Sequence, residues 1–213
     1  MLIPVSICSP PASMKTIETV SLLTQSEVSF TLLYAHAYDF TQTHLFNYLQ
    51  SVRSHALAIS PWGGQLEQDY WDAIDGMRQH VVSLLEPPDN YDAIVDPPSL
   101  SGNHRPYLAA CHKAIGRGKP IVRMIKREPV SASTHTLHAM SECCCIKDPL
   151  GQPLNIASLN SILIVDDVYA TGKTVAVIVE KLRQRGLPPH VSITVACPLR
   201  VIPQSPIASA DIP

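Results

Sequence analysis

The stretch that decides the fold is Ile162-Leu163-Ile164-Val165-Asp166-Asp167-Val168-Tyr169-Ala170-Thr171-Gly172-Lys173-Thr174. Its four apolar residues predict a buried strand. Two acids follow where that strand must emerge at its carboxyl end, which is where ligands of open α/β sheets bind. A short loop then leads into residues with helical spacing. The stretch therefore predicts a strand, a ligand-binding loop and a helix.

The sequence around this stretch alternates short apolar runs with amphipathic segments. Strands are predicted at Tyr91–Asp96, Pro120–Ile125, Ser161–Asp166 and Val191–Cys197. One helix is predicted over Asn103–Arg117, and a second follows the third strand and stops at Gly186. Such alternation is typical of a parallel sheet. We therefore predict an α/β fold, an open parallel sheet flanked by helices.

The N-terminal part of the chain predicts a helical extension of this fold. Apolar residues recur at helical spacing over Thr41–Leu57 and over Gln65–Leu85. A strand is also a candidate at Ser29–Ala35. The residues before it are broken by prolines and predict no element.

The sequence predicts one main domain with two appendages. We place the N-terminal extension at residues 1–33, the α/β domain at residues 34–199 and a tail at residues 200–213. Residues 126–160 show no sustained period. A loop of that length inside a compact domain predicts a mobile segment or a functional lid.

Charge and hydropathy exclude several classes of protein. The 213 residues contain 16 Lys and Arg against 18 Asp and Glu, so the formal net charge is −2. This balance gives no basic field to attract nucleic acid, and no apolar run approaches the roughly 20 residues that cross a bilayer. We expect a cytoplasmic protein. Charged residues make up only 16% of the chain, which leaves much neutral surface and predicts a homodimer.

The six cysteines are predicted to be free thiols. No Cys-x-x-Cys spacing occurs, and the consecutive thiols of Cys143, Cys144 and Cys145 cannot readily all turn toward one metal ion. The alternatives are a zinc ion held by this triplet with His135 or His138, and a redox-sensitive loop.

The loop after the predicted strand combines groups that bind a phosphate with groups that bind a sugar. Backbone N–H groups and hydroxyls of residues 168–174, with the positive end of the helix dipole, make a socket for a phosphate dianion. Beside it, Asp166 and Asp167 can accept hydrogen bonds from adjacent sugar hydroxyls, directly or through a divalent cation. Together these features indicate a ribose 5-phosphate ligand.

Two other interpretations of this loop were weighed against that one. Gly172-Lys173-Thr174 copies the end of a nucleotide-triphosphatase P-loop, but that pattern requires a glycine at position 167, where Asp167 stands. A carboxylate there would face the phosphates, which argues against a P-loop. The other alternative is an ordinary strand end and helix cap in which the two acids are solvated.

Residues 162–174 resemble the signature of the type I phosphoribosyltransferases, which has four apolar residues, two acids and a Thr-Gly-x-Thr loop. Within that superfamily the chain is most similar to ComF-like, competence-associated proteins, with Asp96-Pro97-Pro98 as the double-proline strand end. ComF proteins usually begin with a cysteine-rich zinc module, whereas Cys8 is the only cysteine before Asp96. Their mobile loop carries an Arg-x-x-Asn element, whereas no arginine follows Arg127 before Leu154. Lys173 replaces a small residue of the phosphate loop.

The resemblance implies that a nitrogen nucleophile displaces pyrophosphate from C1 of 5-phosphoribosyl 1-diphosphate (PRPP), with Mg²⁺ as cofactor. It implies that the catalytic residues, which hold the ribose hydroxyls and the metal directly or indirectly, are Asp166 and Asp167. The 5-phosphate is then bound by Ala170, Thr171, Gly172, Lys173 and Thr174. The pyrophosphate is held by Ser99, Ser101, Gly102, Arg105, Lys126 and Arg127.

Two functional classes remain open. The first is a phosphoribosyltransferase of unknown acceptor. The second is a non-catalytic regulator that binds PRPP or a nucleotide, or a DNA-uptake accessory protein of the ComF type. The two acids and the Thr171-Gly172-x-Thr174 loop favour ligand binding in both classes, whereas the altered segment after Arg127 weakens only the first.

Overall fold

The described part of the chain is built around one sheet. The computed structural model describes residues 14–38, 79, 82, 85, 90–99, 112–113, 118–126, 136–147, 154–166 and 168–202. Its strands are β1 (Met14–Ser21), β2 (Glu27–Tyr38), β3 (Ala93–Ser99), β4 (Ile121–Lys126), β5 (Cys144–Lys147), β6 (Ser161–Val165), β7 (Val168–Tyr169) and β8 (Ser192–Val201). Its helices are α4 (Leu137–Cys143), the 3-10 helix η3 (Ile156–Ser158) and α5 (Lys173–Gln184).

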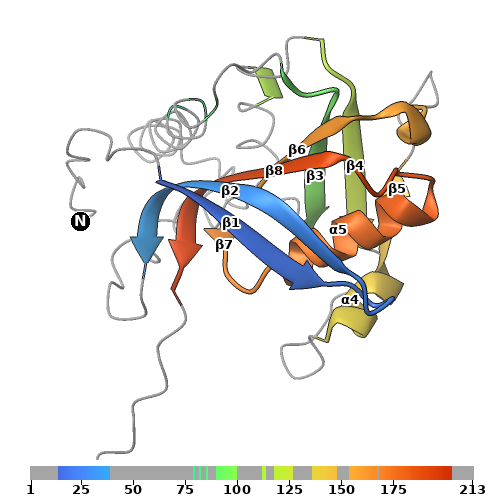
Figure 1. The fold of residues 1–213 in the computed structure, drawn as a ribbon, viewed down its shortest axis with the longest axis horizontal. Helices are drawn as coiled ribbons and strands as arrows, with labels where there is room; N and C mark the ends of the chain where they lie inside the picture. Colours follow the sequence, from blue (N-terminus) through green and yellow to red (C-terminus); the bar gives the residue numbers. More distant parts are fainter. Residues whose placement is uncertain are drawn as a thin grey trace, which may run out of the picture.

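The strand order confirms the predicted fold class. The sheet runs β1-β2-β8-β6-β3-β4-β5, and β7 also pairs with β8. The four inner pairings are parallel, whereas β1 on β2 and β5 on β4 are antiparallel. Helices α4 and α5 pack against each other beside this open sheet (Figure 1). The four strands predicted in the C-terminal part of the chain correspond to β3, β4, β6 and β8.

Strand β6 and helix α5 form the centre of the hydrophobic core. The four apolar residues of β6, 162–165, are at most 1% exposed, because parallel neighbours and packed side chains cover both faces. On α5, Val175, Ile178 and Leu182 follow helical spacing and are at most 2% exposed. The helix ends as predicted, because Gly186 adopts a positive φ of +97° that closes the last turn.

The sheet extends further toward the N-terminus than the sequence predicted. The candidate strand Ser29–Ala35 lies inside β2, and the predicted boundary between residues 33 and 34 falls within that strand. Residues 14–33 therefore belong to the sheet and contain no helix where they are described. Strand β1 escaped prediction because it is an edge strand of mostly polar residues, whose Ile17 is 68% exposed.

Three predicted helices cannot be compared with the structure. Those over 41–57, 65–85 and 103–117 fall outside the described residues, apart from residues 79, 82, 85, 112 and 113. At the other end of the chain, β8 runs to Val201, past the predicted start of the tail at residue 200.

The segment predicted as one long loop, residues 126–160, contains regular structure. Helix α4 begins where the Thr136 hydroxyl accepts a hydrogen bond from the Ala139 N–H, at 3.2 Å. Strand β5 follows directly and pairs with β4. The prediction of a structureless loop here was wrong, because a helix of seven residues and a strand of four are too short to show a period.

The described cysteines agree with the prediction of free thiols. Cys143, Cys144, Cys145 and Cys197 are all free. Within the described ranges, no group of three or more Cys, His, Asp or Glu side chains could hold a metal ion. His138 instead lies 3.2 Å from Glu142 on α4. His135 lies outside the described ranges.

No helix among these residues is both long enough and apolar enough to cross a membrane.

The core position of β6 generates a stability prediction. We expect Ile164→Ala to lower the free energy of unfolding by about 2–5 kcal/mol, because it opens a cavity where the side chain is fully buried. The matched control is Ile17→Ala on β1, where the exposed side chain should cost less than about 0.5 kcal/mol. Urea unfolding measures both, and equal losses would contradict the assignment of β6 to the core.

Candidate functional site at the end of β6

Strands β6 and β7 run along β8 in one continuous register that is interrupted at residues 166 and 167. Val165 is paired with Ala196 and Val168 with Leu199. At the interruption, the Asp166 N–H donates a hydrogen bond to the Ala196 carbonyl at 3.0 Å, and the Asp166 side chain is half-buried. Asp166 therefore lies at the carboxyl edge of the sheet, where its position predicts it. Asp167 lies outside the described residues.

The loop after β7 leads into the N-terminus of α5. Ala170 and Thr171 are exposed, and Gly172 is the N-cap residue with a φ of +73°. Its carbonyl accepts the first helical hydrogen bond from the Ala176 N–H, at 2.9 Å. Because Gly172 has no side chain to cap the helix, the first N–H groups of α5 have no intrahelical partner. The first turn also carries no acid, so the positive end of the helix dipole is not neutralised from within α5.

Gly172 is held between two strands and cannot be another residue without strain. A Cβ built on it would lie 2.4 Å from the Val20 Cγ1 on β1 and 2.9 Å from the Tyr169 hydroxyl on β7. Both separations are below contact distance. The positive φ adds a second reason for glycine. The turn into α5 is therefore defined by its contacts with β1 and β7.

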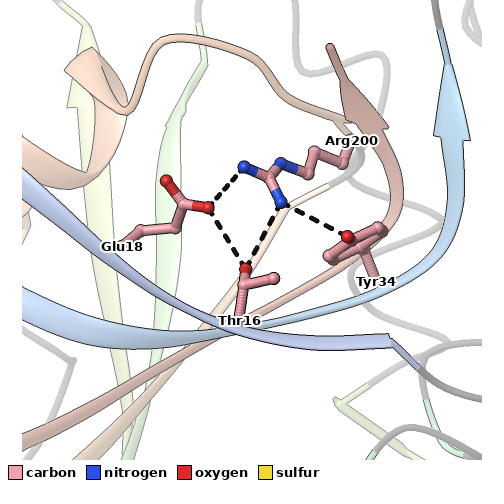
Figure 2. A network of polar contacts seen from close by, with 4 residues as sticks. All are labelled: Thr16, Glu18, Tyr34 and Arg200. Carbon is pink, nitrogen blue, oxygen red and sulfur yellow. Dashed lines mark hydrogen bonds and ion pairs between the residues drawn. The ribbon is translucent and has the colours of Figure 1, made fainter.

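A polar network joins β1, β2 and β8 beside this loop (Figure 2). The Arg200 Nη2 lies 2.5 Å from the Glu18 Oε1, and the two side chains are 24% and 21% exposed. Thr16 donates to Glu18 at 3.2 Å, and Arg200 donates to the Tyr34 hydroxyl at 3.3 Å. Arg200 is also in register with Tyr169 of β7. The network thus fixes β1 over the end of β8.

The sequence gave no signal for this network. Thr16 and Arg200 are 184 residues apart, and polar residues at alternate positions of an edge strand read as a solvated face. Only Tyr169 lies inside the conspicuous stretch 162–174.

The neighbouring strand ends carry a second set of polar residues. Asp96 on β3 accepts a hydrogen bond from the His112 Nε2 at 2.7 Å and lies 3.7 Å from the Arg123 Nε of β4. Lys126, the last residue of β4, is half-buried and is paired with Cys144. Because β3 separates β4 from β6, Lys126 and Asp166 come from strands roughly 10 Å apart at the same edge.

The remaining predicted pyrophosphate residues are only partly described. Ser99 is the last residue of β3, beyond the buried Pro97 and Pro98. The others lie outside the described ranges, and they are Ser101, Gly102, Arg105 and Arg127.

No known protein-family profile matches the chain. No curated protein sequence matches it either. Several solved structures are similar in fold. A hypoxanthine phosphoribosyltransferase from Staphylococcus aureus is 14% identical, with a TM-score of 0.36 over 73% of this chain and 75% of the other. An orotate phosphoribosyltransferase from Aeropyrum pernix is 15% identical, with a TM-score of 0.33 over 88% of both chains.

A third similar structure is an adenine phosphoribosyltransferase from Trypanosoma brucei, in complex with AMP, pyrophosphate and ribose-5-phosphate. It is 15% identical, with a TM-score of 0.39 over 78% of this chain and 88% of the other. The functional interpretation below is built on this chain's own residues and their positions.

The geometry of Gly172 generates a testable prediction. We expect Gly172→Ala to destabilise the protein by about 1–2 kcal/mol for the positive φ and by a further 1–3 kcal/mol for the overlap with Val20 and Tyr169. The control is Gly118→Ala, which has a φ of +82° and nothing within 4 Å of the added Cβ, so only the first cost applies. Urea unfolding compares the two variants, and equal losses would mean that the neighbours yield at no cost.

Proposed function

We propose that this protein is a PRPP-binding phosphoribosyltransferase that transfers ribose 5-phosphate to a nitrogen acceptor and releases pyrophosphate. One observation carries the proposal. The carboxylate of Asp166 and the uncapped N-terminus of α5 lie at the same edge of a parallel sheet, separated only by the short strand β7 and its loop. Acid and anion socket are the two parts that a ribose 5-phosphate requires.

The 5-phosphate is assigned to the socket formed by Ala170, Thr171, Gly172, Lys173 and Thr174. The first N–H groups of α5 supply hydrogen bonds and the positive dipole end. The exposed Thr171 hydroxyl and the half-buried Thr174 hydroxyl are further donors. Lys173 is exposed at the first position of the helix, where its charge favours a bound dianion.

The ribose hydroxyls are assigned to Asp166 and Asp167. A half-buried carboxylate at a strand end accepts hydrogen bonds from vicinal hydroxyls and stays accessible to the ligand. Mg²⁺ fits this site, because it is commonly held by one or two carboxylates together with substrate phosphates and water. Bound there, Mg²⁺ would neutralise charge on the pyrophosphate leaving group.

The pyrophosphate is assigned to the ends of β3 and β4. Lys126 places an ammonium group at the edge that also carries Asp166. We include Ser99, Ser101, Gly102, Arg105 and Arg127 in the same assignment because they follow the ends of these two strands in the sequence.

The reaction asks for positioning more than for covalent chemistry by the protein. The C1–oxygen bond to pyrophosphate breaks, the acceptor nitrogen bonds to C1, and positive charge develops on the ribose in between. The carboxylate of Asp166 beside the sugar stabilises that charge. The socket at α5 holds the 5-phosphate still, so that C1 stays aligned between nucleophile and leaving group.

The second candidate is a PRPP- or nucleotide-binding regulator, or a DNA-uptake accessory protein of the ComF type, which keeps the socket without the transfer. One observation favours it. Residues 137–147 of the predicted lid are held in α4 and β5, and β5 is hydrogen-bonded to β4. That part of the segment cannot close over a substrate without breaking the β4–β5 pairing.

Two measurements separate these candidates. Calorimetry with PRPP and Mg²⁺ tests their shared premise, and an intact protein that binds no PRPP contradicts both. Release of pyrophosphate in a screen of nucleobases and amines then supports the transferase. Binding without release for every acceptor tried supports the regulator.

The role of the acids is tested by Asp166→Asn combined with Asp167→Asn. We expect PRPP affinity to fall at least tenfold while the unfolding midpoint is preserved, because the Asp166 side chain lies at the strand end and outside the core. The control is Glu27→Gln, an exposed acid at the opposite, amino end of β2. Calorimetry measures both affinities, and unchanged binding by the double variant would refute the assignment.

The phosphate socket is tested by Thr171→Ala. The variant loses one exposed hydroxyl donor, so its affinity for ribose 5-phosphate should fall about tenfold, whereas its affinity for ribose should not change. Thr24→Ala, in the turn between β1 and β2, removes an exposed hydroxyl elsewhere and serves as the control. An equal loss for both ligands would show that Thr171 does not read the phosphate.

A further inference from the structure

Tyr169 is a buried tyrosine whose hydroxyl points at the N-terminus of α5. The residue is 7% exposed, and its ring packs edge-on against Phe30 with the centroids 6.0 Å apart. Its hydroxyl lies 2.9 Å from the Cβ position of Gly172, the N-cap residue of the helix. The phenol therefore ends at the turn that begins the phosphate socket.

This hydroxyl lacks a partner inside the protein. No hydrogen bond between residues that the structure describes involves the Tyr169 hydroxyl, and its neighbour across Gly172 is the apolar Val20. Enclosing a hydroxyl without a partner costs roughly 1–3 kcal/mol. A buried donor left open toward an uncapped helix N-terminus is therefore available to a bound anion.

Strand β1 holds Tyr169 in this position. Thr16, Glu18 and Val20 occupy alternate positions and so share one face of the strand. The first two bind Arg200, which is in register with Tyr169, and the third covers Gly172 (Figure 2). One strand thus contacts both residues that flank the phenol.

The phenol keeps its proton in this environment. Burial and the nearby Glu18 carboxylate raise the pKa of Tyr169 to about 12, against the opposing charge of Arg200. Below that pH the hydroxyl is neutral and remains a hydrogen-bond donor.

We infer that the Tyr169 hydroxyl is a further ligand-binding group, which donates a hydrogen bond to the phosphate monoester held at the N-terminus of α5. The Glu18–Arg200 pair and Val20 are positioning residues that act through Tyr169. This inference rests on the proposed ribose 5-phosphate site, and it adds a donor from β7 to a socket otherwise built from backbone N–H groups and threonines.

The test is Tyr169→Phe in the full chain, which removes the hydroxyl and keeps the ring contact with Phe30. Calorimetry should show a five- to twentyfold loss of affinity for ribose 5-phosphate, with unchanged affinity for ribose and an unchanged unfolding midpoint. The matched control is Tyr91→Phe, a buried tyrosine before β3 whose hydroxyl bonds Thr194. This variant should keep the wild-type affinity for ribose 5-phosphate.

The outcomes distinguish this inference from the proposed function. A wild-type protein that binds no ribose 5-phosphate overturns both. Wild-type binding with unchanged affinity in Tyr169→Phe overturns only the role of the hydroxyl. A loss of affinity that comes with a lowered unfolding midpoint, or that Tyr91→Phe reproduces, also overturns it, because the hydroxyl would then act on the fold.

A double-mutant cycle tests the positioning residues. Glu18→Gln should weaken ribose 5-phosphate binding in the wild-type background and have little further effect in the Tyr169→Phe background, because its action passes through the hydroxyl. Additive losses in the two backgrounds would overturn the positioning role.

Discussion

The structure depends on the pairing of β8 with β2 on one side and with β6 and β7 on the other. A single register along β8 fixes where β6 ends, and therefore where Asp166 emerges from the sheet. The same strand carries Arg200 to the level of Tyr169 and into contact with Glu18 of β1. A shift of one residue in this pairing would turn alternate side chains to the wrong face and separate these groups.

The second constraint is the narrow space around Gly172. The left-handed turn lets the chain leave β7 and enter α5 at once, with Val20 and the Tyr169 hydroxyl at distances that exclude a side chain. The cost of such a tight turn is offset by the core that α5 buries against the sheet, where Ile178 and Leu182 are fully covered. Core packing thereby holds the helix N-terminus, and the proposed phosphate socket, at the edge of the sheet.

Prediction from the sequence succeeded where structure is local and buried. Strand β6 reads as a continuous apolar run because both of its faces are covered, and α5 shows the helical period because one face packs on the sheet. It failed where elements are short or lie at an edge. Strand β1 is half solvated and largely polar, and α4 with β5 is too short for a period to appear.

By itself, the sequence determined the strand–loop–helix unit over residues 161–186 and the position of Asp166 at the end of its strand, because these features depend on neighbouring residues. Tertiary structure alone decided the Glu18–Arg200 pair and the contact of Val20 and Tyr169 with Gly172. The physical reason is sequence separation. Thr16 and Arg200 are 184 residues apart, and they meet only because the sheet register brings β1 over the end of β8.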